Sequence, residues 1–539
     1  MLAQLLWPIA LTLAGYAIYH TSYFIYREWA SPLRFVEGPP SASLLLGNLS
    51  EMVTAAKMSG WQKQFGKTFR FRGLFSMSQL QTADIKALNH IFANPEIYRK
   101  PFNNVVMQRL HGEGLLSVEL GAHTQQRRLL NPAFGTAQIR LLTEIFVEKS
   151  IQLRNIWAKQ VDATTSADGV QIDVSSWLRR VALDIIGEAG FNHHFNSLDE
   201  DGKPDELDEA FTELFHSPKA QHAFAAVTAQ ARFPILRLLP IPGASVIDNA
   251  SASMHAAGER IVSNSLAVLE ASEEGGKSLG AKRDLLSVLL KANVSPGVLE
   301  HQRLTESEMV AQIPTFLAAG HETSSSAVTW ALHALSLSPL VQSKLREELL
   351  GLNTENPSME ELNSLPYLEN IVRETLRVHS PIPSIQRQAV QDDVLPLSTP
   401  YIGKDGTEHE SLPIPKGQLV DIPILAVNTD KDIWGEDAEL FRPERWENIP
   451  TAANSVPGIW SHLLTFFAGP HHCIGFRFSL VEIKALLFVL LRSFEFVPAV
   501  PDKDIMPTAL GLRRPLVKGQ DGASRLPLLV KLYQSEHED

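Results

Sequence analysis

Cysteine is nearly absent from this sequence, because Cys473 is the only one among 539 residues. A single thiol excludes any disulfide within the chain and is typical of a protein kept in a reducing compartment. Runs rich in Lys or Arg are also missing, and the net charge is −12, so nucleic acid is excluded as a general partner. No repeat and no signature for binding flavin or nicotinamide is present, so a redox reaction would need electrons from a separate protein.

Charged side chains are missing from residues 1–26, where Leu, Ile, Ala, Tyr and Trp predominate. A helix of about 20 such residues spans about 30 Å, enough to cross the hydrocarbon core of a bilayer. A cleaved signal peptide normally begins with basic residues, and none precedes this run. We therefore expect a single-pass transmembrane anchor over 1–26. Because Arg27 and Arg34 follow it, we expect the chain beyond it in the cytosol, after a proline-rich hinge over 27–41.

The composition is that of a globular protein, with 44% hydrophobic and 20% charged residues. Most of residues 42–539 show the apolar periodicity of helices. Alternating aromatic and polar residues around Gly73 predict a short hairpin between Thr68 and Gln81. We expect a fold that is mainly α with small β-sheets, as one large domain over 42–539.

The lone cysteine lies in the stretch 466–475, Phe-Phe-Ala-Gly-Pro-His-His-Cys-Ile-Gly, just before an apolar helix predicted from Ile474 to Phe496. Unpaired backbone N–H groups and the helix dipole at such a terminus favour a thiolate, which is the form that binds metal. Gly469 would permit a tight turn, and Gly475 would leave space for a flat ligand. The ordinary alternative is a small buried hydrophobic side chain.

Two cationic or hydrogen-bonding side chains, His123 and Arg127, are four residues apart and therefore share one face of a helix that stops near Pro132. Such a pair suits an anionic group such as a carboxylate. The alternative is a helix face in contact with solvent only.

A capping box at Thr305 and Glu308 opens a helix that runs to Ser338. Its middle, residues 318–323, reads Ala-Ala-Gly-His-Glu-Thr, and small and hydroxyl residues of this kind loosen a helix and can open a groove. A glycine-kinked structural helix is the alternative.

Glu374 and Arg377 occupy a helix predicted from Pro366 to His379 and meet on one of its faces. Apolar neighbours indicate that this helix is enclosed, where an unbalanced charge would be costly. Arg445 is the third charge that we expect in the same cluster.

Taken together, these motifs resemble those of the cytochrome P-450 superfamily, in particular its membrane-anchored, microsomal members of the fungal type. Phe466, Gly469, Cys473 and Gly475 match the haem-binding loop of that family in register. The similarity extends over the chain after residue 30. It implies the cytochrome P-450 fold, with an N-terminal transmembrane helix and one catalytic domain. It also implies haem b, whose iron Cys473 ligates.

The resemblance assigns further roles. Thr323 would hydrogen-bond bound dioxygen, and Glu322 would feed protons to it through water, while His321 has no catalytic role. Ala319 and Gly320 would leave space for dioxygen. The haem propionates would be held by His123, Arg127, His471 and Arg387. The triad Glu374, Arg377 and Arg445 would lock the loop before the cysteine. Candidates for the substrate pocket are Phe316, Ile382, Pro383 and Ile385, and residues around 222–239 would form a lid that dips into the membrane.

Two positions depart from the family pattern: Phe467 replaces a small residue and His471 replaces the usual Arg. An imidazole titrates near pH 6.5 whereas a guanidinium stays charged, so haem affinity and redox potential are expected to differ from the family norm.

The implied function is a haem-thiolate monooxygenase of the endoplasmic reticulum membrane, acting in secondary metabolism. Dioxygen and NADPH would be co-substrates, with electrons passed by a separate cytochrome reductase or, as a second donor, cytochrome b5. The substrate would be lipophilic, such as a terpenoid, steroid or fatty acid. A haem-thiolate isomerase, dehydratase or peroxygenase, or a non-catalytic haem sensor, are the alternatives. The presence of both Glu322 and Thr323 favours the monooxygenase.

Overall fold

The structure is a computed structural model. It describes residues 2–52, 55–101, 104–164, 168–199, 244–274, 284–404, 406–508, 511–520 and 523–534, with the single positions 209, 227, 230 and 236. The chain forms two compact units: residues 1–101 with 384–426, and residues 102–383 with 427–539. The lid expected around 222–239 lies almost wholly outside the described residues. The predicted domain boundaries remain a prediction, and each unit is described by itself.

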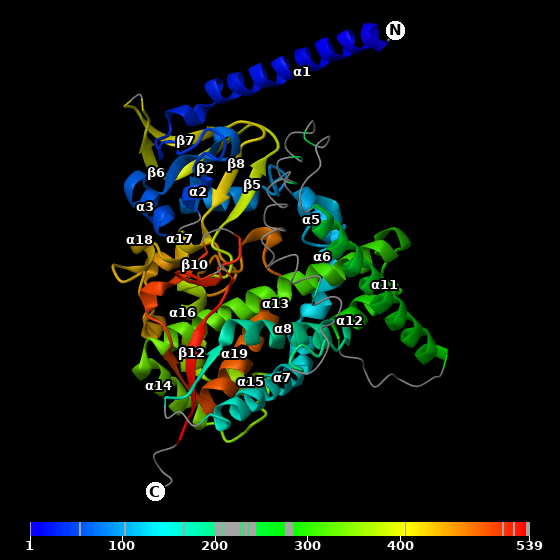
Figure 1. Ribbon diagram of the computed structural model, residues 1–539, viewed down its shortest axis with the longest axis vertical. Helices are drawn as coiled ribbons and strands as arrows, with labels where there is room; N and C mark the ends of the chain where they lie inside the picture. Colours follow the sequence, from blue (N-terminus) through cyan, green and yellow to red (C-terminus); the bar gives the residue numbers. More distant parts are fainter. Residues whose placement is uncertain are drawn as a thin grey trace. The chain divides into compact units, whose positions relative to one another are not determined.

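The first unit is built on a five-stranded sheet with the order β1-β2-β8-β5-β3 (Figure 1). Strands β1 (Thr68–Arg72) and β2 (Ser78–Thr82) pair antiparallel, so the predicted hairpin is present. β8 (Leu419–Ile422) joins β2 in parallel, followed by β5 (Ile385–Ala389) and β3 (Tyr98–Arg99). A second hairpin pairs β6 (Asp393–Ile402) with β7 (Glu408–Ile414). Helices α2 (Leu49–Met52), α3 (Ala55–Phe65) and α4 (Ile85–Ala93) complete the unit.

The amino-terminal segment forms one helix, α1 (Leu2–Ala30). Its last turn is attached to the sheet, because Glu28 accepts hydrogen bonds from Arg72 Nη1 at 2.9 Å and from the Ser78 backbone N–H at 3.0 Å. The predicted hinge over 27–41 therefore begins inside a helix that is anchored to β1 and β2. In the part of the chain that the structure describes, no helix is both long and apolar enough to cross a membrane, so the predicted transmembrane segment is not supported.

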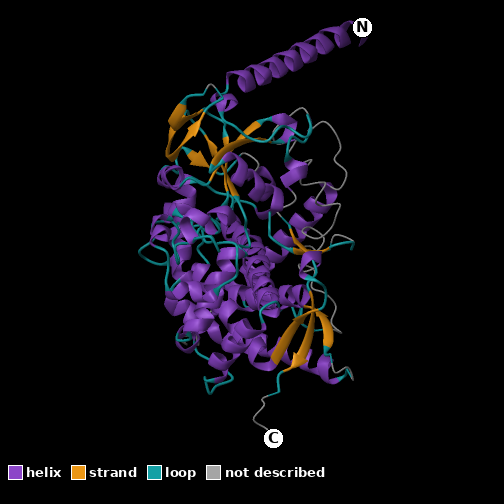
Figure 2. Ribbon diagram, turned by 90° about the vertical axis from the view of Figure 1, so that its left-hand side faces the viewer, coloured by secondary structure: helices purple, strands orange, loops and turns teal. Residues whose placement is uncertain are grey.

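The second unit is mostly helical, as the purple ribbon in Figure 2 shows. Helix α13 (Glu306–Ser336) packs against four other helices of this unit. They are α8 (Val174–Phe191), α11 (Ala244–Glu274), α16 (Pro366–Val378) and α19 (Phe476–Ser493). Around these lie α5 (Asn104–His111), α6 (Leu120–Leu130), α7 (Thr136–Asp162), α12 (Leu285–Val294), α14 (Pro339–Leu350) and α15 (Met359–Asn363). The predicted mainly α fold with small sheets is confirmed.

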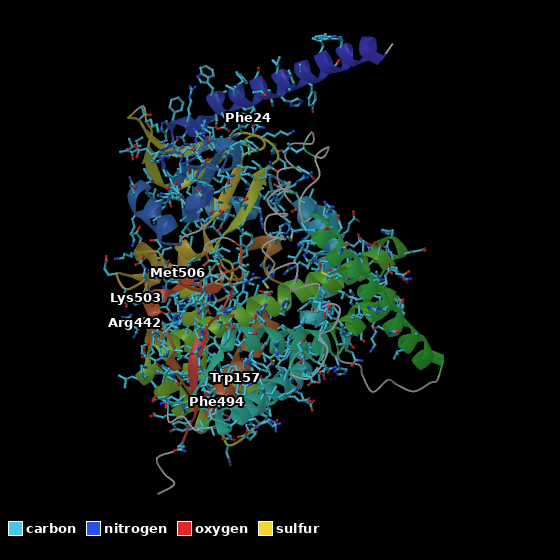
Figure 3. The ribbon with its side chains drawn as sticks, viewed as in Figure 1. Phe24, Trp157, Arg442, Phe494, Lys503 and Met506 are labelled. Atoms are coloured by element: carbon cyan, nitrogen blue, oxygen red, sulfur yellow. The ribbon has the colours of Figure 1, made fainter. Side chains whose placement is uncertain are left out.

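A three-stranded antiparallel sheet, β4-β12-β9, closes one side of this unit. It consists of β4 (Val170–Asp173), β12 (Pro527–Leu532) and β9 (Phe494–Pro498). The helix expected to reach Phe496 ends earlier, at Ser493, because Phe494 and Phe496 are used as core residues of β9. Both rings pack on Trp157 of α7, at centroid distances of 6.0 and 6.2 Å. Figure 3 labels Trp157 and Phe494.

The predicted capping box at the start of α13 is present. The Thr305 hydroxyl accepts from the Glu308 N–H at 3.2 Å, and the Glu308 carboxylate accepts from the Thr305 N–H at 2.8 Å. These bonds satisfy backbone donors that the first helical turn leaves unpaired.

Gly320 has a packing role that the sequence did not indicate. A Cβ atom there would lie only 2.9 Å from the Ile186 side chain of α8. The glycine thus allows α13 and α8 to approach closely. Its expected role in leaving space for dioxygen stays a prediction, because Gly320 is also partly exposed.

The charge cluster on α16 is enclosed completely. Glu374 and Arg377 are both 0% exposed and form a two-point ion pair with distances of 2.7 and 2.9 Å. Arg445 lies 3.5 Å from Glu374 and makes a shorter contact of 2.6 Å to Asp437. The structure therefore brings the three predicted residues together, with Asp437 as an additional partner.

Asn428 connects this cluster with the segment that leads to the cysteine. Arg377 donates to the Asn428 carbonyl at 3.0 Å, and the Asn428 side chain accepts from the Leu464 N–H at 2.9 Å. The same side chain donates to Thr465 Oγ1, which in turn donates to the Leu376 carbonyl at 2.7 Å. The segment before the cysteine is thus bonded to α16 twice, through Asn428 and through Thr465.

Replacing Glu374 by Gln should make the protein easier to unfold, because Arg377 would lose its buried counter-charge and Arg445 would keep only Asp437. We expect a loss of about 3–5 kcal/mol in the free energy of unfolding, measured by urea denaturation. Glu360→Gln is the matched control, since Glu360 pairs with Arg140 on the surface, where both side chains are 54% exposed. That change should leave the free energy of unfolding nearly unchanged, because solvent screens an exposed ion pair. Equal losses in the two variants would contradict the structural role of the cluster.

Candidate functional site

The cysteine lies in a tight loop between Phe466 and α19. The loop is closed by a hydrogen bond from the Cys473 N–H to the Phe466 carbonyl at 2.9 Å. Gly469 adopts a φ of 64°, so the predicted tight turn requires the freedom of glycine there. Phe467 also has a positive φ, 63°, although it is a buried aromatic residue. Such a conformation is unfavourable for a bulky side chain, which explains why a small residue is usual at this position.

Cys473 is accessible to solvent at its residue surface. Desolvation by the surrounding protein nevertheless raises the pKa of its thiol, while the Gly475 N–H and the Arg127 charge act in the opposite direction. The backbone N–H that we expected to favour the thiolate is thus present at Gly475, but desolvation outweighs it and the net direction of the pKa shift is upward. The physical reason is that α19 begins at Phe476, three residues beyond the thiol, and desolvation outweighs the few donors near it.

Helix α6 supplies two side chains to the cysteine loop. Arg127 Nη1 donates to the His472 carbonyl at 2.6 Å, and the ring of His123 lies 4.1 Å from that of His471. His471 Nε2 is in turn 3.5 Å from the carboxylate of Glu119, which precedes the first turn of α6. Both side chains predicted on one helix face thus contact the cysteine loop, His123 at the predicted residue His471 and Arg127 at the backbone of His472.

Aromatic rings surround the loop on its other sides. Phe466 is 8% exposed and packs against the rings of Trp460 and Phe476 at 5.5 and 5.9 Å. Phe316 of α13 packs edge-on against Phe134, at 5.3 Å. A Cβ at Gly475 would lie 3.6 Å from the same Phe134 ring, an ordinary contact, so the backbone does not require glycine there. Phe134 therefore lies between Gly475 and Phe316.

Helix α13 is buried from Met309 to Ser336 except at Ala318, Ala319, Gly320 and Thr323. Ala319 is exposed and Thr323 is partly exposed. The hydroxyl of Thr323 donates to the Ala319 carbonyl at 2.7 Å, as threonines in helices often do. The exposed stretch of this otherwise buried helix thus presents the methyl group of Ala319 and the hydroxyl group of Thr323. Both residues were singled out from the sequence.

Glu322 is buried and already engaged. One carboxylate oxygen accepts from Arg514 at 2.8 Å, and the other lies 3.3 Å from His321 Nε2. The carboxylate also borders a small polar cleft with Ser175, Ser325 and Ser524. Glu322 therefore lies next to Thr323 in sequence but interacts with the protein on a different side of α13.

The remaining predicted residues are divided between the two units. Arg387 is 5% exposed in the first unit, where it donates to the Gln386 carbonyl at 2.9 Å. Ile385 precedes it on the same strand. Ile382 and Pro383 belong to the second unit, and the Ile382 carbonyl accepts from Ser380 Oγ at 3.0 Å. The roles of these four residues stay predictions.

Haem, which the resemblance implies, needs an accessible thiol, cationic groups for two carboxylates and an uncovered apolar face. The second unit offers all three kinds of group. Cys473 is accessible, Arg127 and the His123–His471 pair adjoin its loop, and Ala319 and Thr323 are open on α13. The residues present therefore fit this cofactor.

Two residues that hold the site in place, Asn428 and Arg514, were not predicted from the sequence. Asn428 and Arg514 contact their partners across 36 and 192 positions of the chain, and no local pattern encodes such a distance. A signal for Asn428 did exist. It is a lone amide at the end of the apolar run 422–427, and a buried amide needs hydrogen-bond partners.

Comparison with known proteins agrees with this geometry. The family model described as "Cytochrome P450" matches residues 38–519. "Cytochrome P450 monooxygenase 205" of Postia placenta is 44% identical over 526 residues, which cover 96% of each chain. "Cytochrome P450 monooxygenase 128" of the same fungus is 43% identical over 98% of each chain, and "Cytochrome P450 monooxygenase claQ" of Ampulloclitocybe clavipes is 34% identical over 94% of each. The chain therefore belongs to the cytochrome P450 family and shares the monooxygenase class of these fungal relatives.

Proposed function

We propose that this protein inserts one atom of dioxygen into a lipophilic small molecule, using electrons from NADPH that a separate reductase delivers. The observation that carries the proposal is the accessible thiol of Cys473, held in a loop beside three basic side chains. Cytochrome b5 is a second candidate electron donor. The chain supplies no flavin or nicotinamide signature of its own, which supports a separate donor.

Cys473 would hold haem b through its thiolate, within the loop shaped by Phe466, Gly469 and Gly475. When bound, haem with a thiolate ligand supplies the reductive activation of dioxygen. His123, Arg127 and His471 would pair with the haem propionates, and Arg387 would add a further cation. Because Glu119 lies beside His471, one carboxylate already competes for this histidine. Arg127 is therefore the most direct candidate for a propionate.

Thr323 and Glu322 would take part in proton transfer. The Thr323 hydroxyl donates its hydrogen bond to the Ala319 carbonyl, so its oxygen can still accept a hydrogen bond from another group. Glu322 would supply protons through water, and Ala319 would leave space for dioxygen. General acid–base assistance of this type typically contributes about 10²- to 10⁴-fold in rate.

The substrate would be a terpenoid, steroid or fatty-acid-like compound of secondary metabolism. Apolar side chains at Phe316, Ile382, Pro383 and Ile385 are the proposed contacts. We propose further that α1 attaches the protein to the endoplasmic reticulum membrane. Large apolar side chains on this helix are 65–71% exposed at Trp7, Leu11 and Ile18, and exposed surface of this kind marks interaction sites.

The reduced protein should give a strongly red-shifted Soret band with carbon monoxide, as thiolate-ligated haem does. Cys473→Ser should abolish that band, because a neutral hydroxyl is a poor substitute for a thiolate. Ser455→Ala is the control, since its exposed hydroxyl bonds only within its own turn. The same band in Cys473→Ser, or no haem uptake by folded wild type, would contradict the proposed cofactor site.

Thr323→Val should divert electrons from product to hydrogen peroxide, because it removes a hydroxyl at the opening while keeping the side-chain shape. We expect the share of NADPH recovered as peroxide to rise at least about twofold, measured with a terpenoid, steroid or fatty acid that perturbs the wild-type Soret band. Thr315→Val is the matched control. It deletes an equivalent hydroxyl on α13 that donates to the Ala311 carbonyl but is 1% exposed. Equal coupling in wild type and Thr323→Val would refute the role of this hydroxyl.

Leu11→Asp and Ile18→Asp should each release the protein from membranes, because a carboxylate costs about 3 kcal/mol in an apolar environment. Sedimentation of the full chain with vesicles of neutral phospholipid measures the bound fraction. Ile402→Asp serves as control, since Ile402 is 68% exposed at the end of β6 and Ile18 is 67% exposed on α1. Unchanged binding of both α1 variants would show that α1 is not the attachment.

A further inference from the structure

A row of polar side chains crosses the five-stranded sheet of the first unit. Gln81 of β2 pairs with Asp421 of β8, and Asp421 pairs on its other side with Gln386 of β5. Residues that are directly paired project from the same face of a sheet, so the three side chains are neighbours. Gln81 and Asp421 are each 2% exposed, whereas Gln386 is partly exposed. The row is therefore buried at β2 and β8 and reaches solvent at β5.

The buried end of the row adjoins an apolar cluster. Phe69 of β1 pairs with Gln81 and packs in a buried cluster with apolar side chains of α2 and α3. Such neighbours exclude the water that normally stabilises a carboxylate. Burial accordingly raises the pKa of Asp421 to about 7, although a hydrogen bond from Ser384 acts in the opposite direction. Among the described residues, no charged side chain contributes to this pKa shift.

Two oxygen atoms of the row have no hydrogen-bond partner in the part of the chain that the structure describes. They are Gln81 Oε1 and Asp421 Oδ2, and both atoms are buried. The Nε2 group of Gln386 donates instead to Gln79 Oε1, at 3.2 Å. Buried polar atoms in native proteins nearly always have a partner, so these two acceptors call for a group that donates hydrogen bonds. The alternative is a neutral Asp421 that itself donates to Gln81 Oε1 and needs no ligand.

The number and the charge of these acceptors favour an ammonium group. An ammonium group carries three N–H donors, so one such group can bond to oxygen atoms on two neighbouring strands. Its positive charge also stabilises the ionised form of a buried carboxyl group that has no other cation to pair with. A hydroxyl group has one donor and no charge, so it would satisfy only one of the two oxygens.

We propose that the row formed by Gln81, Asp421 and Gln386 binds the ammonium group of a lipophilic amine. Asp421 Oδ2 and Gln81 Oε1 would accept its hydrogen bonds, and the apolar body of the ligand would leave past Gln386. When the carboxyl group is protonated, binding breaks its O–H bond and releases one proton to solvent, while the amine keeps all of its hydrogens. The inference concerns the first unit alone and does not depend on the proposed haem chemistry.

Calorimetric titration with octylammonium and with 1-octanol tests this site. The reduced, carbon monoxide-bound holoprotein is used, so that the amine cannot ligate the haem iron. At pH 8 we expect wild type to bind octylammonium at least about tenfold more tightly than 1-octanol, as a hydrogen bond to a charged group typically allows. Asp421→Asn keeps the shape of the side chain but loses the charge, so it should bind the two ligands about equally.

The pH dependence of binding is a second readout. With a pKa of about 7, Asp421 is mostly protonated at pH 6 and mostly ionised at pH 8. Because the ligand needs the ionised form, its affinity for wild type should fall about tenfold between pH 8 and pH 6. Close to one proton should be released for each octylammonium bound at pH 6, which titrations in buffers with different heats of ionisation measure. Asp421→Asn should show neither effect.

Asp392→Asn is the matched control, because Asp392 is exposed in the same unit and accepts from the Lys416 N–H at 2.7 Å. It should bind both ligands as wild type does. Equal affinities of wild type for octylammonium and 1-octanol would identify Asp421 as a neutral structural acid and overturn the proposal. A wild-type affinity for octylammonium that is the same at pH 6 and pH 8 would overturn it without any variant. None of these readouts requires turnover, so a failure of the proposed monooxygenase reaction would leave them intact.

Discussion

The buried ion pair between Glu374 and Arg377 is the interaction on which the site depends. Both side chains have no exposure, so each must be satisfied by protein groups, and these groups come from distant parts of the second unit. Arg445 and Asp437 complete the cluster. Asn428 connects it by hydrogen bonds to the segment before the cysteine. The segment before Cys473 is therefore held in place by an ion pair that is fully buried.

Helix α13 combines close packing with a local opening. Its glycine lets α8 approach through Ile186, and most of its length is enclosed. The opening at Ala319 and Thr323 is thus bounded by a rigid wall, which is what a precisely placed reactive group requires. The same residue pattern thus gives close packing on one side of the helix and an exposed stretch on another.

Charge is distributed unequally around this helix. Basic side chains from α6 and the cysteine loop gather near the thiol, and the Glu119 carboxylate lies 3.5 Å from His471. On a different side, Glu322 lies between Arg514 and His321 at the edge of a polar cleft. The basic groups proposed to hold an anionic cofactor are thereby kept apart from Glu322, which is proposed to supply protons.

Local patterns in the sequence determined the hairpin at Thr68, the capped start of α13, the turn at Gly469 and the membership of the family, because each depends on residues close together in the chain. The charge cluster was predictable as well, since buried charges must find partners. Tertiary structure alone decided that Gly320 packs on Ile186, that β9 ends the last helix at Ser493, and that desolvation raises the pKa of Cys473. It alone also decided that Glu322 pairs with Arg514. These outcomes depend on contacts between distant segments and on the density of atoms around a group, neither of which a local pattern records.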